Sequence, residues 1–135
     1  MENLKPTKTP CCLSTRLLPH AGVSLSDPTE YRSMVGALQY LTFTCLDLAF
    51  SVHQLCQFVS NPTSTHLEAA KRVLRYVKGT LNHGINISPG PLTLTTFSDA
   101  DWAEGLIDYR FTTRLLVFVG PSPISWFAKK QNTMS

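Results

Sequence analysis

The spacing of apolar residues changes once along this chain, and that change constrains the possible folds more than any other feature of the sequence. Up to about residue 82, apolar side chains recur three and four residues apart, as on one face of a helix. From Gly84 onward they alternate with polar side chains, as in strands. Helices followed by strands predict an α+β fold, or two adjoining pieces.

The first 26 residues do not share this periodicity. Residues 1–26 are rich in Pro, Ser and Thr, and we interpret them as a connector of loop or extended chain. Residues 27–82 then hold the predicted helices, and residues 83–135 the predicted strands. A chain of 135 residues has room for one ordinary domain or two partial ones.

The first predicted helix has a well-marked start. Asp27 can cap it, Pro28 suits the first helical position, and Glu30 would complete a capping box. Gly36 weakens the helix interior by about 1 kcal/mol relative to alanine. The apolar face of this helix consists of Tyr31, Val35, Leu38 and Leu41.

Two further helices are predicted. The second runs from Asp47 to about Ser60 and ends at an Asn-Pro pair, which disfavours continuation of the helix. The third begins near residues 63–65, with Thr65 and Glu68 as its capping pair, and ends close to Gly79.

One face of the third predicted helix is basic. Lys71, Arg75 and Lys78 fall at i, i+4 and i+7, and Arg72 lies beside them. Several cations on one rigid face suit contact with the phosphates of a nucleic acid. The alternative is a solvated face whose cations lie near the negative end of the helix.

The strand region predicts a hairpin and a pair of carboxylates. Residues 92–97, 112–119 and 124–128 are expected to form strands, with residues 120–123 joining the last two. Asp99 and Asp101 follow the first strand and, two residues apart, point to the same face. Such a pair needs solvent, a basic partner or a metal ion to offset its repulsion. Solvated loop carboxylates are the alternative.

Several longer runs of residues resemble a known family. The runs are MENLKP (residues 1–6), YRSMVGALQYLT (31–42), KRVLRYVKGT (71–80), SDADWA (98–103) and ISWFAKKQ (124–131). In this order and spacing they are similar to the Pol polyprotein of copia-type retrotransposons, over nearly the whole chain. The resemblance places the segment at the end of the reverse transcriptase and the start of RNase H.

The resemblance implies a fold and a chemistry. Helices like those of the reverse transcriptase thumb or connection would precede an incomplete, RNase H-like sheet of three antiparallel strands. Asp99 matches the first catalytic carboxylate of RNase H, a ligand of the Mg²⁺ that the intact family uses. We assign no ligand role to Asp101. The basic helix would contact an RNA–DNA hybrid through Lys71, Arg72, Arg75 and Lys78.

Departures from the family pattern predict a loss of activity. Glu104 and Arg114 stand where the family has glycine, no Y-x-D-D polymerase motif occurs, and the remaining carboxylates would follow Ser135. We therefore expect a non-catalytic remnant that retains no cofactor. The alternatives are a nucleic-acid-binding module, and RNase H activity only by complementation with a second chain that supplies the missing carboxylates.

Composition and sequence pattern indicate the partners and the cellular compartment that we expect for the protein. A net charge of +3 is compatible with a nucleic-acid partner, and no apolar run is long enough to cross a membrane. No signal-peptide core occurs at the N-terminus, so we expect an intracellular protein with free thiols, Cys45 and Cys56 being packed as small apolar side chains. The uncovered strands predict an apolar patch or an open edge, which leaves the oligomeric state undetermined.

Overall fold

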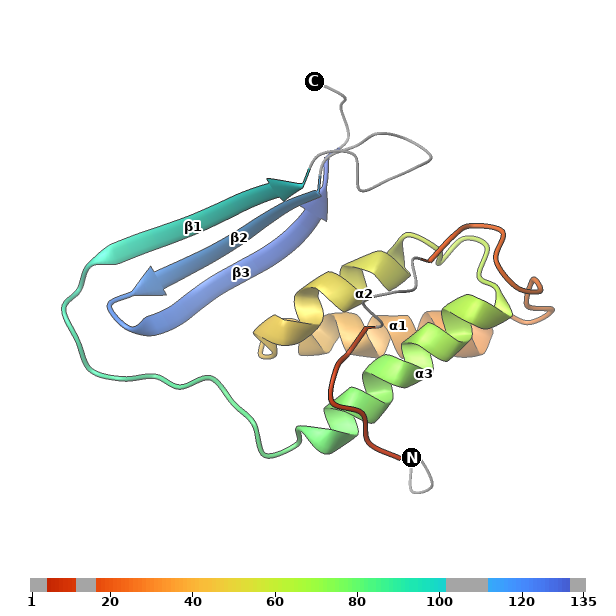
Figure 1. Cartoon of the computed structure of the whole chain (residues 1–135), viewed down its shortest axis with the longest axis horizontal. Helices are drawn as coiled ribbons and strands as arrows, with labels where there is room; N and C mark the ends of the chain where they lie inside the picture. Colours follow the sequence, from red (N-terminus) through yellow and green to blue (C-terminus); the bar gives the residue numbers. More distant parts are fainter. Residues whose placement is uncertain (1–4, 12–16, 102–111, 132–135) are drawn as a thin grey trace. The chain divides into compact units, whose positions relative to one another are not determined.

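The fold is α+β, with three helices followed by a three-stranded antiparallel sheet, as the change in periodicity predicts (Figure 1). The computed structural model describes residues 5–11, 17–101 and 112–131. The chain divides into two compact units, residues 1–83 and 84–135, and each is described by itself. No helix in the described ranges is long and apolar enough to span a membrane.

The helical unit contains α1 (Thr29–Leu41), the 3₁₀ turn η1 (Leu46–Leu48), α2 (Ala49–Cys56) and α3 (Ser64–Gly79). All of these contribute to one core, because the apolar side chains of each recur on a single face. The buried apolar residues are Tyr31, Val35, Leu38, Leu48, Val52, Leu55, Ala70 and Val73.

The predicted apolar face of α1 is confirmed, apart from its last residue. Tyr31, Val35 and Leu38 are buried, whereas Leu41 is partly buried and packs on the edge of the core. The buried Tyr31 hydroxyl donates a hydrogen bond to the carbonyl of Leu55 at 2.8 Å, which links α1 to α2. Burial raises the pKa of Tyr31 above its usual range.

The start of α1 differs in detail from the prediction. Pro28, and not Asp27, stands at the N-cap position, and the helix begins at Thr29. The Asp27 carboxylate still accepts a hydrogen bond from the amide of Thr29 at 2.9 Å, so Asp27 does satisfy a free amide of the first turn. Glu30, however, lies 3.7 Å from the ammonium of Lys71 on α3. That pair connects two helices, which sequence spacing alone does not reveal.

The break between α1 and α2 contains the 3₁₀ turn η1. Asp47 in η1 accepts a hydrogen bond from the Tyr76 hydroxyl of α3, and this bond raises the pKa of Tyr76 to about 12. The free thiols of Cys45 and Cys56 pack against the core as predicted. The break is thus held by tertiary contacts.

The second helix is shorter than predicted, because it ends at Cys56 and not near Ser60. Arg32 of α1 contacts the chain just beyond this end. Its guanidinium donates to the carbonyls of Val59 (3.0 Å) and Ser60 (3.3 Å). A side chain from another helix thus satisfies two carbonyls that follow the end of α2.

The predicted capping pair of α3, Thr65 with Glu68, is wrong. Thr63 has an extended backbone and caps the helix, and His66 is the reciprocal partner of the capping box. Thr65 already lies within the helix. Histidine can take the place of Glu or Gln in this box because its unprotonated ring nitrogen accepts a hydrogen bond from the cap amide.

The sheet unit consists of β1 (Leu94–Asp101), β2 (Thr112–Val119) and β3 (Ser122–Lys130), in the order β1-β2-β3 (Figure 1). Both pairings are antiparallel, and the β2–β3 pairing has a register shift between Val117 and Phe118. The predicted hairpin is confirmed, with Gly120 in its turn at a φ of 54°. A Cβ there would lie 2.6 Å from the carbonyl oxygen of Pro91.

Candidate functional site

Asp99, the predicted vestigial carboxylate, lies within β1 and not beyond its end. The strand extends to Asp101 because Asp99, Ala100 and Asp101 pair with Arg114, Thr113 and Thr112 of β2. Directly opposite Asp99, the Arg114 guanidinium donates to the Asp99 carboxylate at 3.3 Å. The Asp99 side chain is 65% exposed and that of Arg114 34% exposed. This carboxylate therefore has a basic partner, one of the three options that its charge required.

The surroundings of Asp99 do not fit a magnesium ion. A carboxylate that binds Mg²⁺ presents its oxygens to the ion together with other oxygen ligands. Here one carboxylate oxygen, Oδ2, already accepts from the cationic Arg114. Among the residues that the structure describes, no three His, Cys, Asp or Glu side chains gather as a metal site would require. The side chain of Asp101 and all of Glu104 lie outside the described part.

The four predicted nucleic-acid-binding residues lie on α3, and all four interact with other parts of the chain. Lys71 pairs with Glu30 at 3.7 Å. The Arg72 guanidinium donates to Thr9 Oγ1 at 2.8 Å, and Arg75 Nε donates to the carbonyl of Lys5 at 2.7 Å. Lys78 lies in the last turn of α3.

The N-terminal connector runs along this basic face. The Thr7 amide donates to the carbonyl of Arg75 at 3.4 Å, and the Thr7 hydroxyl to the carbonyl of Arg72 at 3.5 Å. Pro6 lies against Gly79, where an added Cβ would be 3.2 Å from its ring. The sequence predicted this segment as loop or extended chain, but nothing in it indicated where the segment lies.

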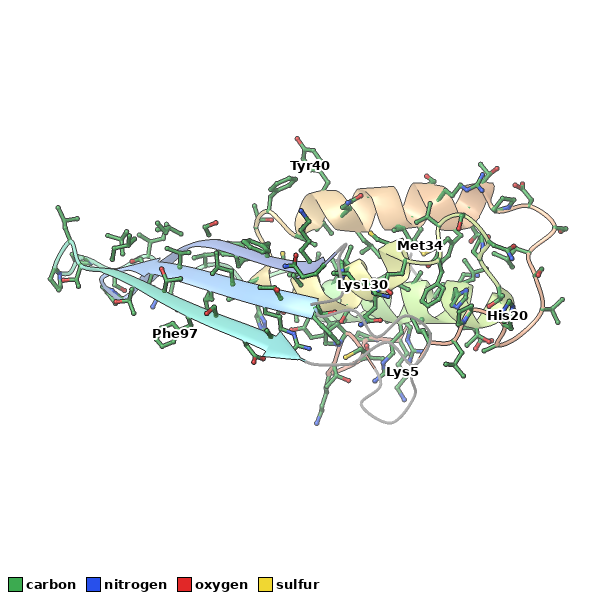
Figure 2. All side chains as sticks on the ribbon, turned by 90° about the horizontal axis from the view of Figure 1, so that it is seen from above. Lys5, His20, Met34, Tyr40, Phe97 and Lys130 are labelled. Atoms are coloured by element: carbon green, nitrogen blue, oxygen red, sulfur yellow. The ribbon has the colours of Figure 1, made fainter. Side chains whose placement is uncertain are left out.

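Connector and helix together form one basic surface. The connector adds Lys5 and Lys8, both exposed, to the cations of α3 (Figure 2 labels Lys5). We use the term basic surface for Lys5, Lys8, Lys71, Arg72, Arg75 and Lys78. The two arginines hold the connector in place, while the two connector lysines extend the positive charge beyond the helix. Sequence reasoning missed these lysines because they lie more than sixty residues away from α3 in the chain.

A second stretch of the connector is fastened at the other end of α3. The amide of Leu25 donates to the carbonyl of Pro62 at 3.1 Å, and the amide of Ser64 donates to the carbonyl of Val23 at 2.8 Å. Ser24 and Thr63 form an antiparallel bridge. The connector thus meets both ends of α3 through hydrogen bonds.

His66 links this stretch of the connector to the start of α3 and is fully buried. Its Nδ1 accepts from the amide of Thr63 at 3.0 Å, so Nε2 carries the proton and donates to the carbonyl of Leu18 at 3.0 Å. The ring of Phe58 stacks on the imidazole with centroids 4.0 Å apart. Burial lowers the pKa of His66, although the Leu18 carbonyl partly opposes the shift. His66 is therefore a neutral structural side chain, which its spacing from Thr63 could have indicated.

Comparison with known proteins shows which proteins the chain is similar to. It is 49% identical over 97% of its length to the Retrovirus-related Pol polyprotein from transposon RE1 of Arabidopsis thaliana, of which it spans 9%. It is 42% identical over its whole length to an uncharacterized mitochondrial protein of Arabidopsis thaliana, of which it spans 56%. Secreted RxLR effector protein 161 of Plasmopara viticola is 42% identical over 78% of the chain, which spans 75% of that protein.

These relatives define the class first: the chain is a short relative of retrotransposon Pol polyproteins. Within that class it belongs to the copia-type family, as its sequence runs indicated. It spans only about a tenth of the Pol polyproteins that it matches. No protein-family model matches the chain, and no solved structure matches it.

Proposed function

We propose that this chain is a non-catalytic piece of Pol, corresponding to the end of the reverse transcriptase and the start of RNase H. The observation that carries the proposal is the pairing of Asp99 with Arg114 across the sheet. In the family pattern a glycine stands at the position of Arg114, and a glycine would leave the carboxylate open to a metal ion.

Coulomb's law gives the size of the effect that Arg114 has on the binding of a magnesium ion. An exposed ion pair such as this one contributes only about 0–1 kcal/mol to stability. A divalent ion about 4 Å from the guanidinium would be repelled by about 2 kcal/mol even at the dielectric constant of water. The repulsion of a magnesium ion by Arg114 is therefore larger than the contribution of the Asp99–Arg114 pair to the stability of the fold. We derive no catalytic step through Mg²⁺ at this site.

The test is cleavage of an RNA–DNA hybrid in Mg²⁺ by the purified chain, with Asp99→Asn as the matched control. We expect no cleavage by either protein. Cleavage by the wild type that is lost in Asp99→Asn would contradict the proposal. Cleavage that appears only after a separate RNase H segment is added would show complementation, and Arg114→Gly should then increase it.

Nucleic-acid binding is a second candidate function, which the composite basic surface favours. Lys5 and Lys8 are exposed and lie on a connector that Arg72 and Arg75 hold against α3. Six cations on one surface suit the backbone of an extended nucleic acid, because each phosphate contact releases counterions. In this arrangement the lysines would make the contacts, and the arginines would position the connector.

Fluorescence anisotropy with a labelled hybrid tests the second candidate. If Lys5 and Lys8 each contact one phosphate, their joint change to alanine should reduce the slope of log affinity against log salt by about 2. Lys129→Ala on β3 is the matched control and should leave the slope unchanged. An absence of binding at low salt, or an equal effect of the control, would refute this function.

A further inference from the structure

Thr9 is an exposed residue of the connector, and its hydroxyl contacts a cation of α3. The Arg72 guanidinium donates from Nη2 to Thr9 Oγ1 at 2.8 Å. The connector passes alongside α3 at this point (Figure 1). A hydroxyl is a neutral acceptor, and a hydrogen bond from arginine to an anion is roughly twice as strong. Arg72 would therefore bind residue 9 more tightly if that residue carried a negative charge.

The same guanidinium has a second donor that lacks an acceptor. Arg72 Nε is buried, and among the residues that the structure describes no acceptor pairs with it. A buried donor left in this state destabilises the fold. Nε and Nη2 lie on one edge of the planar guanidinium, so together they can bind two oxygens of one phosphate. An anion attached to Thr9 Oγ1 would supply the acceptors that suit this edge.

Thr9 also precedes a proline, as the acceptor residues of one class of protein kinase do. The chain contains three such pairs, Thr9-Pro10, Ser88-Pro89 and Ser122-Pro123. A following proline favours an extended backbone, the form in which a kinase binds its substrate segment. Ser122 is buried, and its hydroxyl bonds the amide and the carbonyl of Ser88 at 3.0 and 3.1 Å. Thr9 is thus the exposed acceptor of the three.

The connector can open locally and so reach the active site of a kinase. Residues 5–11 contain no helix or strand. Two of their contacts with the backbone of α3 are long: the Thr7 amide lies 3.4 Å from the carbonyl of Arg75, and the Thr7 hydroxyl 3.5 Å from that of Arg72. Hydrogen bonds of this length are weak, and exposed segments held by them open at little cost.

We propose that Thr9 is a phosphorylation site, at which a kinase that requires a following proline adds a phosphate that binds Arg72. The γ-phosphoryl group of ATP moves to Thr9: a bond forms between Oγ1 and phosphorus, the bond to ADP breaks, and the hydroxyl proton passes to a base of the kinase. The product carries about −1.5 to −2 charges and three acceptor oxygens. When the connector returns to α3, an ion pair replaces the neutral hydrogen bond.

Phosphorylation of the full chain by such a kinase with ATP, mapped by mass spectrometry, is the first test. We expect phosphate at Thr9 and none at Ser122 in the folded chain, and Thr9→Ala should abolish the modification. Ser88→Ala is the matched control, because Ser88 also precedes proline, and it should leave the modification unchanged. A kinase that modifies its standard peptide substrate but not Thr9 would overturn the proposal. So would modification of Ser88 or Ser122 as fast as that of Thr9.

Phosphorus NMR of the phosphorylated chain, titrated at about 0.15 M salt, tests the pairing with Arg72. A neighbouring guanidinium favours the dianion, so the second acid dissociation constant of the phosphate should be at least about threefold larger in the wild type than in Arg72→Gln. Arg72→Lys keeps the charge but loses the fork, and it should give an intermediate value.

The matched control for this titration is Lys71→Gln. It removes a cation from the same turn of α3, but the ammonium of Lys71 pairs with Glu30 at 3.7 Å. Its effect on the dissociation constant should be less than half that of Arg72→Gln. Circular dichroism at 222 nm checks that each variant keeps its helices, and Arg72→Lys provides the comparison if Arg72→Gln does not fold. Equal dissociation constants in the wild type and the folded Arg72 variants would overturn the pairing, as would an equal effect of Lys71→Gln.

Discussion

Replacing His66 with alanine should remove the link between the connector and α3. The buried imidazole accepts from the Thr63 amide, donates to the Leu18 carbonyl and stacks on Phe58. A buried amide left without its acceptor costs about 1–3 kcal/mol, and the ring contact is worth about 0.5–1.5 kcal/mol. With the cavity that remains, we expect a loss of about 3–5 kcal/mol. This is a large share of the about 5–15 kcal/mol by which domains are stable.

His66→Gln is the matched variant, because glutamine at this position of a capping box can still accept from the Thr63 amide. It should be about 1–2 kcal/mol less destabilising than alanine. It should also remove a pH dependence. Burial lowers the pKa of His66 below its ordinary 6.5, so the unfolded chain takes up the proton first. The stability that neutral His66 provides is therefore complete above about pH 6.5 and declines as pH falls below it.

Urea unfolding followed by circular dichroism at 222 nm measures the stability of the helical unit. The helices lie in residues 29–79 and dominate that signal. The wild type and both variants would be compared at pH 7.5 and at pH 5. The reasoning is refuted if alanine costs less than about 1 kcal/mol, a value typical of an ordinary substitution. It is also refuted if His66→Gln loses as much stability on acidification as the wild type does.

Three further substitutions test the packing. Leu38→Ala, at a fully buried site, should lower the free energy of unfolding of the helical unit by about 2–5 kcal/mol; a cost below about 1 kcal/mol in urea would place Leu38 outside the core. Gly36→Ala should raise it by about 0.5–1 kcal/mol, since Gly36 is exposed and an added Cβ meets nothing within 4 Å; a lower melting temperature would contradict this. Gly120→Ala should destabilise the sheet by at least about 1 kcal/mol, because its φ is 54° and the Cβ would approach Pro91; an unchanged near-UV melt of the sheet unit would refute it.

Hydrophobic spacing predicted the elements well, but their ends were less accurate. The buried face of α1 follows from apolar residues three and four apart, a pattern that is local. The carbonyls that follow α2 accept hydrogen bonds from Arg32 of another helix, a contact that local spacing does not show. The start of α3 could have been found in the sequence, since Thr63 and His66 have capping-box spacing, but histidine is not a usual member of that pair.

The candidate sites were also predictable from the sequence only in part. The cations of α3 are visible in the sequence because a helix brings residues four apart onto one face. Their partners are not, since Thr9 and Lys5 come from the connector and Glu30 comes from α1. The roles of these cations in nucleic-acid binding, and of Asp99 as a former catalytic carboxylate, stay predictions.

The sequence by itself determined the family, the order of helices and strands, and the faces on which charges and apolar side chains lie. These depend on neighbouring residues, whose periodicity is written directly in the chain. Only the tertiary structure decided that Arg114 lies opposite Asp99 and that the connector covers the arginines of α3. The reason is physical: residues far apart in sequence meet only when strand register and helix packing bring them together, and neither is set by local spacing alone.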